Sequence, residues 1–205
     1  MMSSLKLSAS NSDEIIRQAI SVLLNSGVIA YPTETLYGLG AKYDDEQAVK
    51  RLYELKKRPH EKTIPIIIGS AEQLSLLAES VNDAAADLIS RFWPGPLTLI
   101  LRARAGLNSF IISDGKIAVR VPGESFALRL VRAAGFPLTA TSANISGKPP
   151  AHNAGMVTDY FGSGLDLVVD GGESPSTLPS TIVDVTKETP VLLREGAIKP
   201  SLLFS

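Results

Sequence analysis

The chain has 205 residues, of which 44% are hydrophobic and 20% are charged, and its formal net charge is −1. This balance is ordinary for a globular protein and gives no overall attraction to nucleic acid or to an anionic membrane. The absence of cysteine excludes disulfides, thiolate nucleophiles and cysteine-based zinc sites. No apolar run is long enough to span a bilayer, and residues 1–12 lack the features of a secretory signal. We therefore expect a cytoplasmic protein that does not enter a membrane.

Hydrophobic spacing predicts helices and strands that alternate along the chain. In chain order we expect a helix over 13–26, a strand over 28–31, a helix over 44–56, a strand over 64–68, helices over 71–78 and 83–92, strands over 97–102 and 117–121, a helix over 125–134, a strand over 137–140, a helix over 153–161, and strands over 167–169, 181–185 and 191–194. This order indicates an α/β fold. Some connections are too short for a helical crossover, so we expect a mixed sheet. One domain is predicted over 13–198, with flexible termini over 1–12 and 199–205.

Polar side chains cluster directly after the first predicted strand. Thr33, Glu34, Thr35 and Tyr37 follow it, and two glycines close by permit a ligand to approach the backbone. Ligands of open α/β sheets often bind at strand ends. A locally capped turn explains the hydroxyls equally well, so the segment alone does not decide between the two interpretations.

A basic turn follows the second predicted helix. Four cations lie within residues 56–62, although the charge of the whole chain is balanced. Lysine and arginine together suit a polyphosphate, because arginine gives bidentate contacts and lysine a compact charge. Read in isolation, a solvated basic turn at a helix C-terminus is the favoured interpretation.

Three other segments contain polar or aromatic residues that the stability of the fold alone does not require. Arg120 interrupts an apolar strand and must face solvent or a partner, because an unpaired buried charge is costly. Ser142 and Asn144 lie two residues apart in a strand end and can face one ligand. Trp93, between a helix and a strand, is interpreted mainly as a structural corner. Each segment also has a purely structural explanation.

Several common sites are excluded by their missing motifs. The chain contains neither the phosphate-binding loop G-x-x-x-x-G-K-[ST] nor the dinucleotide fingerprint G-x-G-x-x-G. The only histidines are His60 and His152, neither with a carboxylate at ligand spacing. A histidine-based metal site or a Ser-His-Asp triad is therefore not expected.

Taken together and in order, the motifs resemble those of the YrdC/TsaC family. The resemblance rests on Pro32-Thr33-Glu34-Thr35-Leu36-Tyr37-Gly38-Leu39, Lys56-x-Arg58, Trp93-Pro94-Gly95-Pro96-Leu97-Thr98, Val119-Arg120-Val121-Pro122, Ser142-x-Asn144, Asp170-Gly171-Gly172, Ser180-Thr181-Ile182 and Leu193-Arg194-Glu195-Gly196. It covers most of the chain. It implies a single α/β domain, a twisted mixed sheet around a deep basic cavity, of the short bacterial type.

The resemblance also implies an activity and its residues. Members of the family form threonylcarbamoyl-AMP and pyrophosphate from L-threonine, bicarbonate and ATP, for N6-threonylcarbamoyladenosine in tRNA. By the family pattern, L-threonine is assigned to Thr33, Thr35, Tyr37, Arg120 and Ser180, and the nucleotide to Lys56, Arg58, Lys62, Ser142, Asn144, Lys148 and Arg194, with Lys56 and Arg58 as the catalytic pair. Mg²⁺ is expected to be bound mainly through phosphates and water. The resemblance implies transferase proteins that accept the intermediate as further partners.

Other functions stay open at this point. The main alternative is an RNA-binding or ribosome-maturation protein that binds tRNA or double-stranded RNA with the same basic surface, although a net charge near zero argues against strong nonspecific RNA affinity. A carbamoyl-handling module of the hydrogenase-maturation type is the second alternative, and an inactive relative is the third. The sequence identifies no catalytic base.

Overall fold

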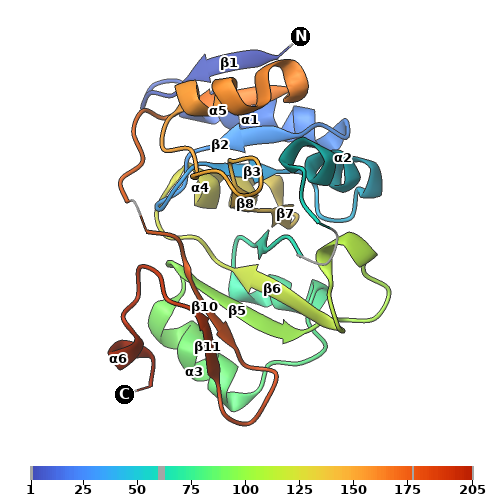
Figure 1. The fold of residues 1–205 in the computed structure, drawn as a ribbon, viewed down its shortest axis with the longest axis vertical. Helices are drawn as coiled ribbons and strands as arrows, with labels where there is room; N and C mark the ends of the chain where they lie inside the picture. The colour runs from blue at the N-terminus through green and yellow to red at the C-terminus, as the bar shows by residue number, and fades with distance from the viewer. Residues whose placement is uncertain (1, 60–62, 177, 205) are drawn as a thin grey trace.

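Two mixed β-sheets, one above the other in Figure 1, form the framework of the chain. The computed structural model describes residues 2–59, 63–176 and 178–204. The first sheet has the strand order β1 (Ser3–Lys6), β9 (Leu167–Asp170), β2 (Ile29–Tyr31), β3 (Gly38–Gly40) and β8 (Thr141–Ser142). The second has the order β11 (Val191–Arg194), β10 (Thr181–Asp184), β5 (Leu97–Arg102), β6 (Lys116–Arg120), β4 (Ile66–Ile67) and β7 (Leu138–Thr139).

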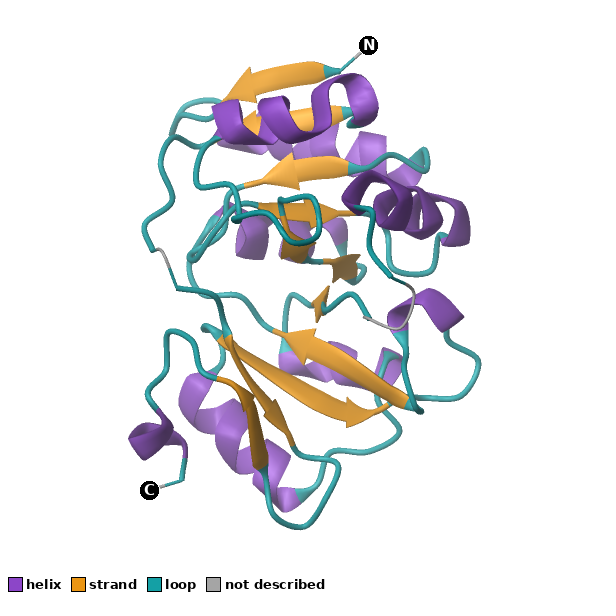
Figure 2. Ribbon diagram, viewed as in Figure 1, coloured by secondary structure: helices purple, strands orange, loops and turns teal. Residues whose placement is uncertain are grey.

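Helices cover both sheets (Figure 2). They are α1 (Ser12–Leu24), α2 (Glu46–Lys56), α3 (Asp83–Phe92), α4 (Phe126–Ala134), α5 (Ala154–Phe161) and α6 (Pro200–Leu203), with short 3₁₀ turns at Ala71–Leu76, Ser109–Ile111 and Gly162–Gly164. No helix in the described ranges is long and apolar enough to cross a membrane.

The predicted α/β class and mixed pairing are confirmed. In the first sheet β2 pairs in parallel with β9 and antiparallel with β3, and in the second β5 pairs in parallel with β10 and antiparallel with β6. The strands are divided between two sheets, whereas the sequence predicted one. The predicted strand over 137–140 shows why: Leu138–Thr139 pairs with β4 of the second sheet, while Thr141–Ser142 pairs with β3 of the first. The chain passes from one sheet to the other at Ala140.

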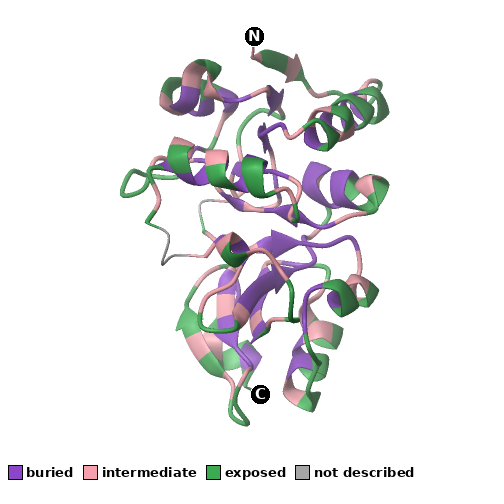
Figure 3. Ribbon diagram, turned by 90° about the vertical axis from the view of Figure 1, so that its right-hand side faces the viewer, coloured by how far each residue is buried: buried purple, intermediate pink, exposed green. Residues whose placement is uncertain are grey.

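Successive side chains of a strand point to opposite faces of the sheet, so the first sheet has a hydrophobic core on each face. In β2, Ala30 packs into one hydrophobic cluster, whereas Ile29 and Tyr31 pack into another, which α1 and α4 cover. Helix α1 contributes Ile15, Ile16, Ala19 and Leu23 to that second cluster, as helical spacing predicts. Figure 3 shows the result: buried residues lie along the strands and the inner faces of the helices, and exposed residues lie outside.

Regular structure forms near both ends of the chain. Ser3–Lys6 forms β1, which pairs in parallel with Leu167–Asp170. Near the other end, Leu203 of α6 is buried. The short, polar first strand has no alternating pattern, since its neighbour β9 rather than its own hydrophobicity holds it in place. The predicted flexibility of the segments over 1–12 and 199–205 stays a prediction.

Candidate active site

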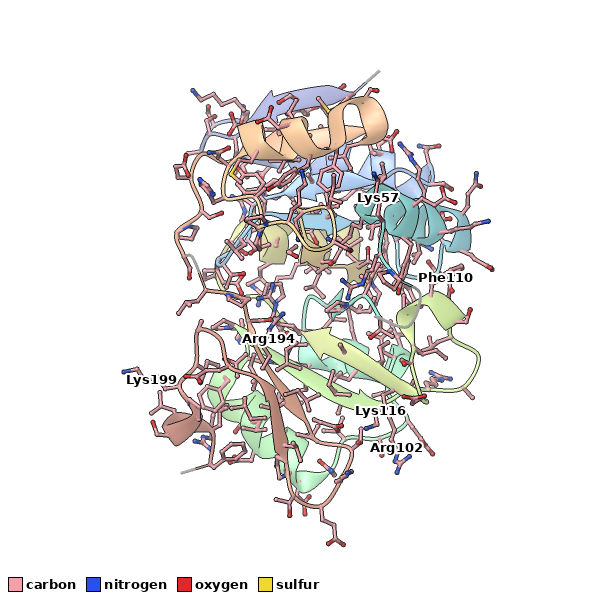
Figure 4. All side chains as sticks on the ribbon, viewed as in Figure 1. Lys57, Arg102, Phe110, Lys116, Arg194 and Lys199 are labelled. Atoms are coloured by element: carbon pink, nitrogen blue, oxygen red, sulfur yellow. The ribbon has the colours of Figure 1, made fainter. Side chains whose placement is uncertain are left out.

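A cavity of about 350 Å³ lies where the two sheets face each other. The first sheet and its loops contribute one wall, which includes Thr33, Thr35, Tyr37 and Ser142, and the second sheet contributes the opposite wall. Among the residues that line it are Arg58, Arg120 and Arg194, which come from three separate parts of the chain. Its volume lies within the range of small-molecule sites. Figure 4 shows Arg194 at the level where the sheets meet, whereas Lys199 and Arg102 project from the outer surface.

The wall formed by the loop after β2 presents hydroxyl oxygens in a fixed arrangement. Thr33 Oγ1 accepts from the N–H groups of Thr35 and Leu36 and donates to the carbonyl of Leu36. The two hydroxyl oxygens are 3.0 Å apart, and either hydroxyl can be the donor. The Thr35 oxygen keeps acceptor capacity toward the cavity. Both interpretations of the segment thus hold: Thr33 organises the turn, and Thr35 can bind a ligand.

Tyr37 has a mainly structural hydroxyl. It donates to the carbonyl of Gly172 at 2.8 Å and accepts from the N–H of Gly171 at 2.9 Å. Burial raises the pKa of Tyr37 to about 12, so the phenol stays protonated at neutral pH. The ring lines the cavity while its hydroxyl holds the turn after β9.

An ion pair joins the two walls beside the cavity. Arg120, at the end of β6, donates from Nη1 to Oε1 of Glu34 at 2.8 Å, and the side chains are 9% and 15% exposed. The other N–H groups of Arg120 have no partner among the described residues. Glu34 Oε2 is buried and has no hydrogen-bond partner there either. The sequence had assigned Arg120 to a carboxylate but had given Glu34 no role; the tertiary contact identifies it as the residue that holds Arg120.

Arg194 and Ser180 close one side of the cavity. Arg194 donates to the Ser180 carbonyl from Nε at 3.0 Å and from Nη2 at 2.7 Å, and Nη2 also donates to Ser180 Oγ at 3.0 Å. Burial, and secondarily the positive charge of Arg120, lower the pKa of Arg194. Two guanidinium groups that repel each other across a cavity favour an anion between them.

Lys56 contacts the 142–144 segment. Its side chain is 1% exposed, and Nζ donates to the carbonyls of Ser142 and Asn144 at 2.5 and 2.9 Å and to Asn144 Oδ1 at 3.2 Å. These contacts occupy all three N–H donors of the ammonium. Burial, and secondarily repulsion from Arg58, lower the pKa of Lys56 to about 7. In this structure Lys56 holds the 142–144 segment from behind, and its assignment to the ATP phosphates stays a prediction.

Local backbone geometry separates Lys56 from Arg58. Lys57 ends α2 in the left-handed conformation, with φ of 48°, so the chain turns sharply between its two neighbours. Lys56 consequently faces the interior, whereas Arg58 lines the cavity and donates to the carbonyl of Thr63 at 2.7 Å. Burial lowers the pKa of Arg58. Predicted Lys62 lies outside the described residues.

Ser142 and Asn144 also differ in position, since only Ser142 is among the described residues that line the cavity. Ser142 lines the cavity and donates from Oγ to Asn144 Oδ1 at 2.6 Å. The Asn144 amide donates to the carbonyls of Ile145 and Lys148, so it organises the loop after β8 and does not face the cavity. Lys148 Nζ lies 5.9 Å from the centre of the Tyr160 ring. Neither Asn144 nor Lys148 is among the described residues that line the cavity, and their assignment as nucleotide ligands stays a prediction.

The arrangement suits a ligand with anionic groups and a polar end. Three guanidinium groups can bind carboxylate or phosphate, and Thr35 supplies an acceptor on the opposite wall. Among the described residues, those that line the cavity include no aspartate or glutamate, and no cluster of three or more potential metal ligands occurs.

Comparison with known proteins gives this site a context. A family model for Sua5, YciO and YrdC proteins, described as telomere recombination, matches residues 21–196. The chain belongs to this Sua5/YciO/YrdC family. The resemblance seen in the motifs is thereby confirmed.

Individual members are similar over most of the chain. A threonylcarbamoyl-AMP synthase of Pyrococcus abyssi is 43% identical over 89% of the chain and 54% of its own length. One from Klebsiella pneumoniae is 39% identical over 89% of the chain and 96% of its own length. The crystal structure of P. abyssi Sua5 complexed with L-threonine superposes with a TM-score of 0.92 at 38% identity, covering 99% of this chain and 59% of that one. The chain thus spans about half the length of the P. abyssi relative and nearly all of the Klebsiella one.

Proposed function

We propose that the chain is a threonylcarbamoyl-AMP synthase, a nucleotidyltransferase that uses L-threonine, bicarbonate and ATP. The observation that carries the proposal is the convergence of Arg58, Arg120 and Arg194 on one cavity that also exposes the Thr35 oxygen. Family membership supports it, as do relatives with this name and the L-threonine complex of a relative.

The cavity suggests where each substrate binds. Arg120 has free N–H groups for the carboxylate of L-threonine, and the Thr35 oxygen can accept from its amine or hydroxyl. Arg58 and Arg194 also line the cavity, and their guanidinium groups suit the more highly charged phosphates. Ser142 lies on the same wall as Thr35 and can bind the nucleotide.

Positioning and charge neutralisation account for the proposed chemistry. The amine of L-threonine and bicarbonate form a carbamate with loss of water; a carbamate oxygen then forms a bond to the α-phosphorus, and the bond to pyrophosphate breaks. The protein holds the two anions together and neutralises the charge that develops on pyrophosphate. Mg²⁺ would be bound mainly by phosphates and water, since the described residues of the wall supply hydroxyl oxygens and no carboxylate.

Partners outside the cavity follow from the product. Threonylcarbamoyl-AMP needs transferase proteins that pass its acyl group to tRNA, and we propose the cytoplasm as the compartment. No observation on the described residues favours direct binding of tRNA or double-stranded RNA. RNA binding is therefore the alternative result of the experiment below.

Pyrophosphate release tests the proposal. The wild type should release pyrophosphate from ATP only when L-threonine and bicarbonate are both present. Arg58→Ala should lower this rate about 100-fold, because it removes a cation from the reacting phosphates. Lys57→Ala, an exposed neighbouring cation, is the matched control and should retain the wild-type rate. Absence of substrate-dependent release from the wild type, with salt-sensitive RNA binding, would refute the synthase and favour the RNA-binding alternative.

A further inference from the structure

A row of five residues crosses the second sheet and forms the floor of the cavity. The strand registers set Arg194 opposite Ile182, Ile182 opposite Thr98, and Ile67 opposite Arg120. Leu99 lies opposite Val119, so the same antiparallel register continued by one residue sets Thr98 opposite Arg120. All five side chains line the cavity. Thr98 therefore lies between two arginines in the row.

Thr98 and Ser180 form a hydroxyl pair in this floor. Their oxygens are 2.9 Å apart, and either hydroxyl can be the donor. The two side chains have two hydroxyl hydrogens, and their mutual bond uses one of them. Arg194 donates to Ser180 Oγ and cannot accept, so it does not take the second hydrogen. No other described residue accepts it, and the pair has one O–H donor left for the cavity.

An unused donor in a nearly closed floor indicates a ligand acceptor. When Ser180 donates to Thr98, the unused hydrogen belongs to Thr98, which is 2% exposed, and a buried hydroxyl hydrogen without an acceptor costs free energy. Facing residues on neighbouring strands lie about 5 Å apart, so this donor and the free N–H groups of Arg120 can reach the same small anion. A carboxylate has two oxygens and accepts from both groups at once.

We propose that Thr98 is a further substrate-binding residue, whose hydroxyl pair with Ser180 donates to the carboxylate that Arg120 binds. The inference rests on the proposed function and deepens it, since it adds Thr98 to the recognition of the amino acid. The motif around Thr98 had suggested mainly a rigid corner. The position of Thr98 in the row, next to Arg120, gives the hydroxyl its role.

Calorimetric titration of L-threonine into the whole chain is the test. Thr98→Val keeps the shape but removes the hydroxyl, and should raise the dissociation constant about tenfold, which is the usual effect of one hydrogen bond to a charged group. Thr98→Ser keeps the hydroxyl and should restore most of the affinity. The KM for ATP should be unchanged in both variants. Thr181→Val removes a buried hydroxyl that bonds Ile198 outside the cavity; it should lower the melting temperature without altering L-threonine affinity.

The outcomes separate this inference from the proposed function. If the wild type does not bind L-threonine, the proposed function fails. If the wild type binds and Thr98→Val binds equally well, only the role of Thr98 is refuted. L-2-aminobutyrate, which lacks the side-chain hydroxyl, locates the contact: a tenfold loss in Thr98→Val with this ligand supports the carboxylate, whereas no loss places the contact at the hydroxyl and overturns the assignment.

Discussion

Replacing Lys56 by methionine tests whether this lysine holds a loop or contacts a phosphate. The ammonium is buried and donates to three oxygens of the 142–144 segment. Methionine fills a similar volume but donates to none of them. Each acceptor left buried without a donor costs about 1–3 kcal/mol, and removal of the buried charge offsets part of this. We expect a net loss of about 3 kcal/mol in the free energy of unfolding.

Urea and thermal denaturation measure this loss. For a chain of this size, about 3 kcal/mol corresponds to a fall of roughly 6–12 °C in melting temperature. Arg58→Met is the matched comparison, because Arg58 lines the cavity; it should change stability by less than about 1 kcal/mol while abolishing ATP binding. A Lys56→Met protein with wild-type stability and the same defect in ATP binding as Arg58→Met would refute the reasoning and restore Lys56 as a direct phosphate ligand.

Three further results are expected. Burial lowers the folded-state pKa of Lys56 to about 7, so above that pH the unfolded chain binds this proton more tightly than the folded chain does. The free energy of unfolding of the wild type should therefore rise from pH 7 to 9 relative to that of Lys56→Met. Parallel curves of the free energy of unfolding against pH for the two proteins would contradict this. Glu34→Ala leaves the buried Arg120 charge unpaired and should lower the free energy of unfolding by about 3 kcal/mol, measured by urea denaturation. In a double-mutant cycle, the loss in the Glu34→Ala/Arg120→Ala variant should be smaller than the sum of the two single losses. Tyr37→Phe removes two bonds to the 171–172 backbone and should cost about 1–2 kcal/mol by the same assay, with catalysis retained.

Much of the fold could be predicted because local signals agreed with the tertiary environment. Strands β5 and β11 have the bounds that hydrophobicity predicted, and α1 buries the face that its spacing defined. The failures occur where neighbours override local sequence. Gly38–Gly40 resembles a turn yet forms β3, because β2 and β8 supply hydrogen bonds on both sides. The two-residue strands around Ala140 belong to different sheets, and no periodicity can reveal that change within four residues.

The sequence by itself determined the family motifs, the α/β class and most of the polar residues that line the cavity, including Arg58, Arg120 and Arg194. Only the tertiary structure decided which charged groups line the cavity. A motif records that Lys56 and Asn144 are polar, but their orientation depends on the left-handed turn after Lys56 and on the oxygens around it. Pairing across strands likewise gives Thr98 its place in the cavity floor. The function of a side chain depends on which partners its hydrogen-bond donors and acceptors contact. Folding decides those partners, because they come from residues that lie far apart in the chain.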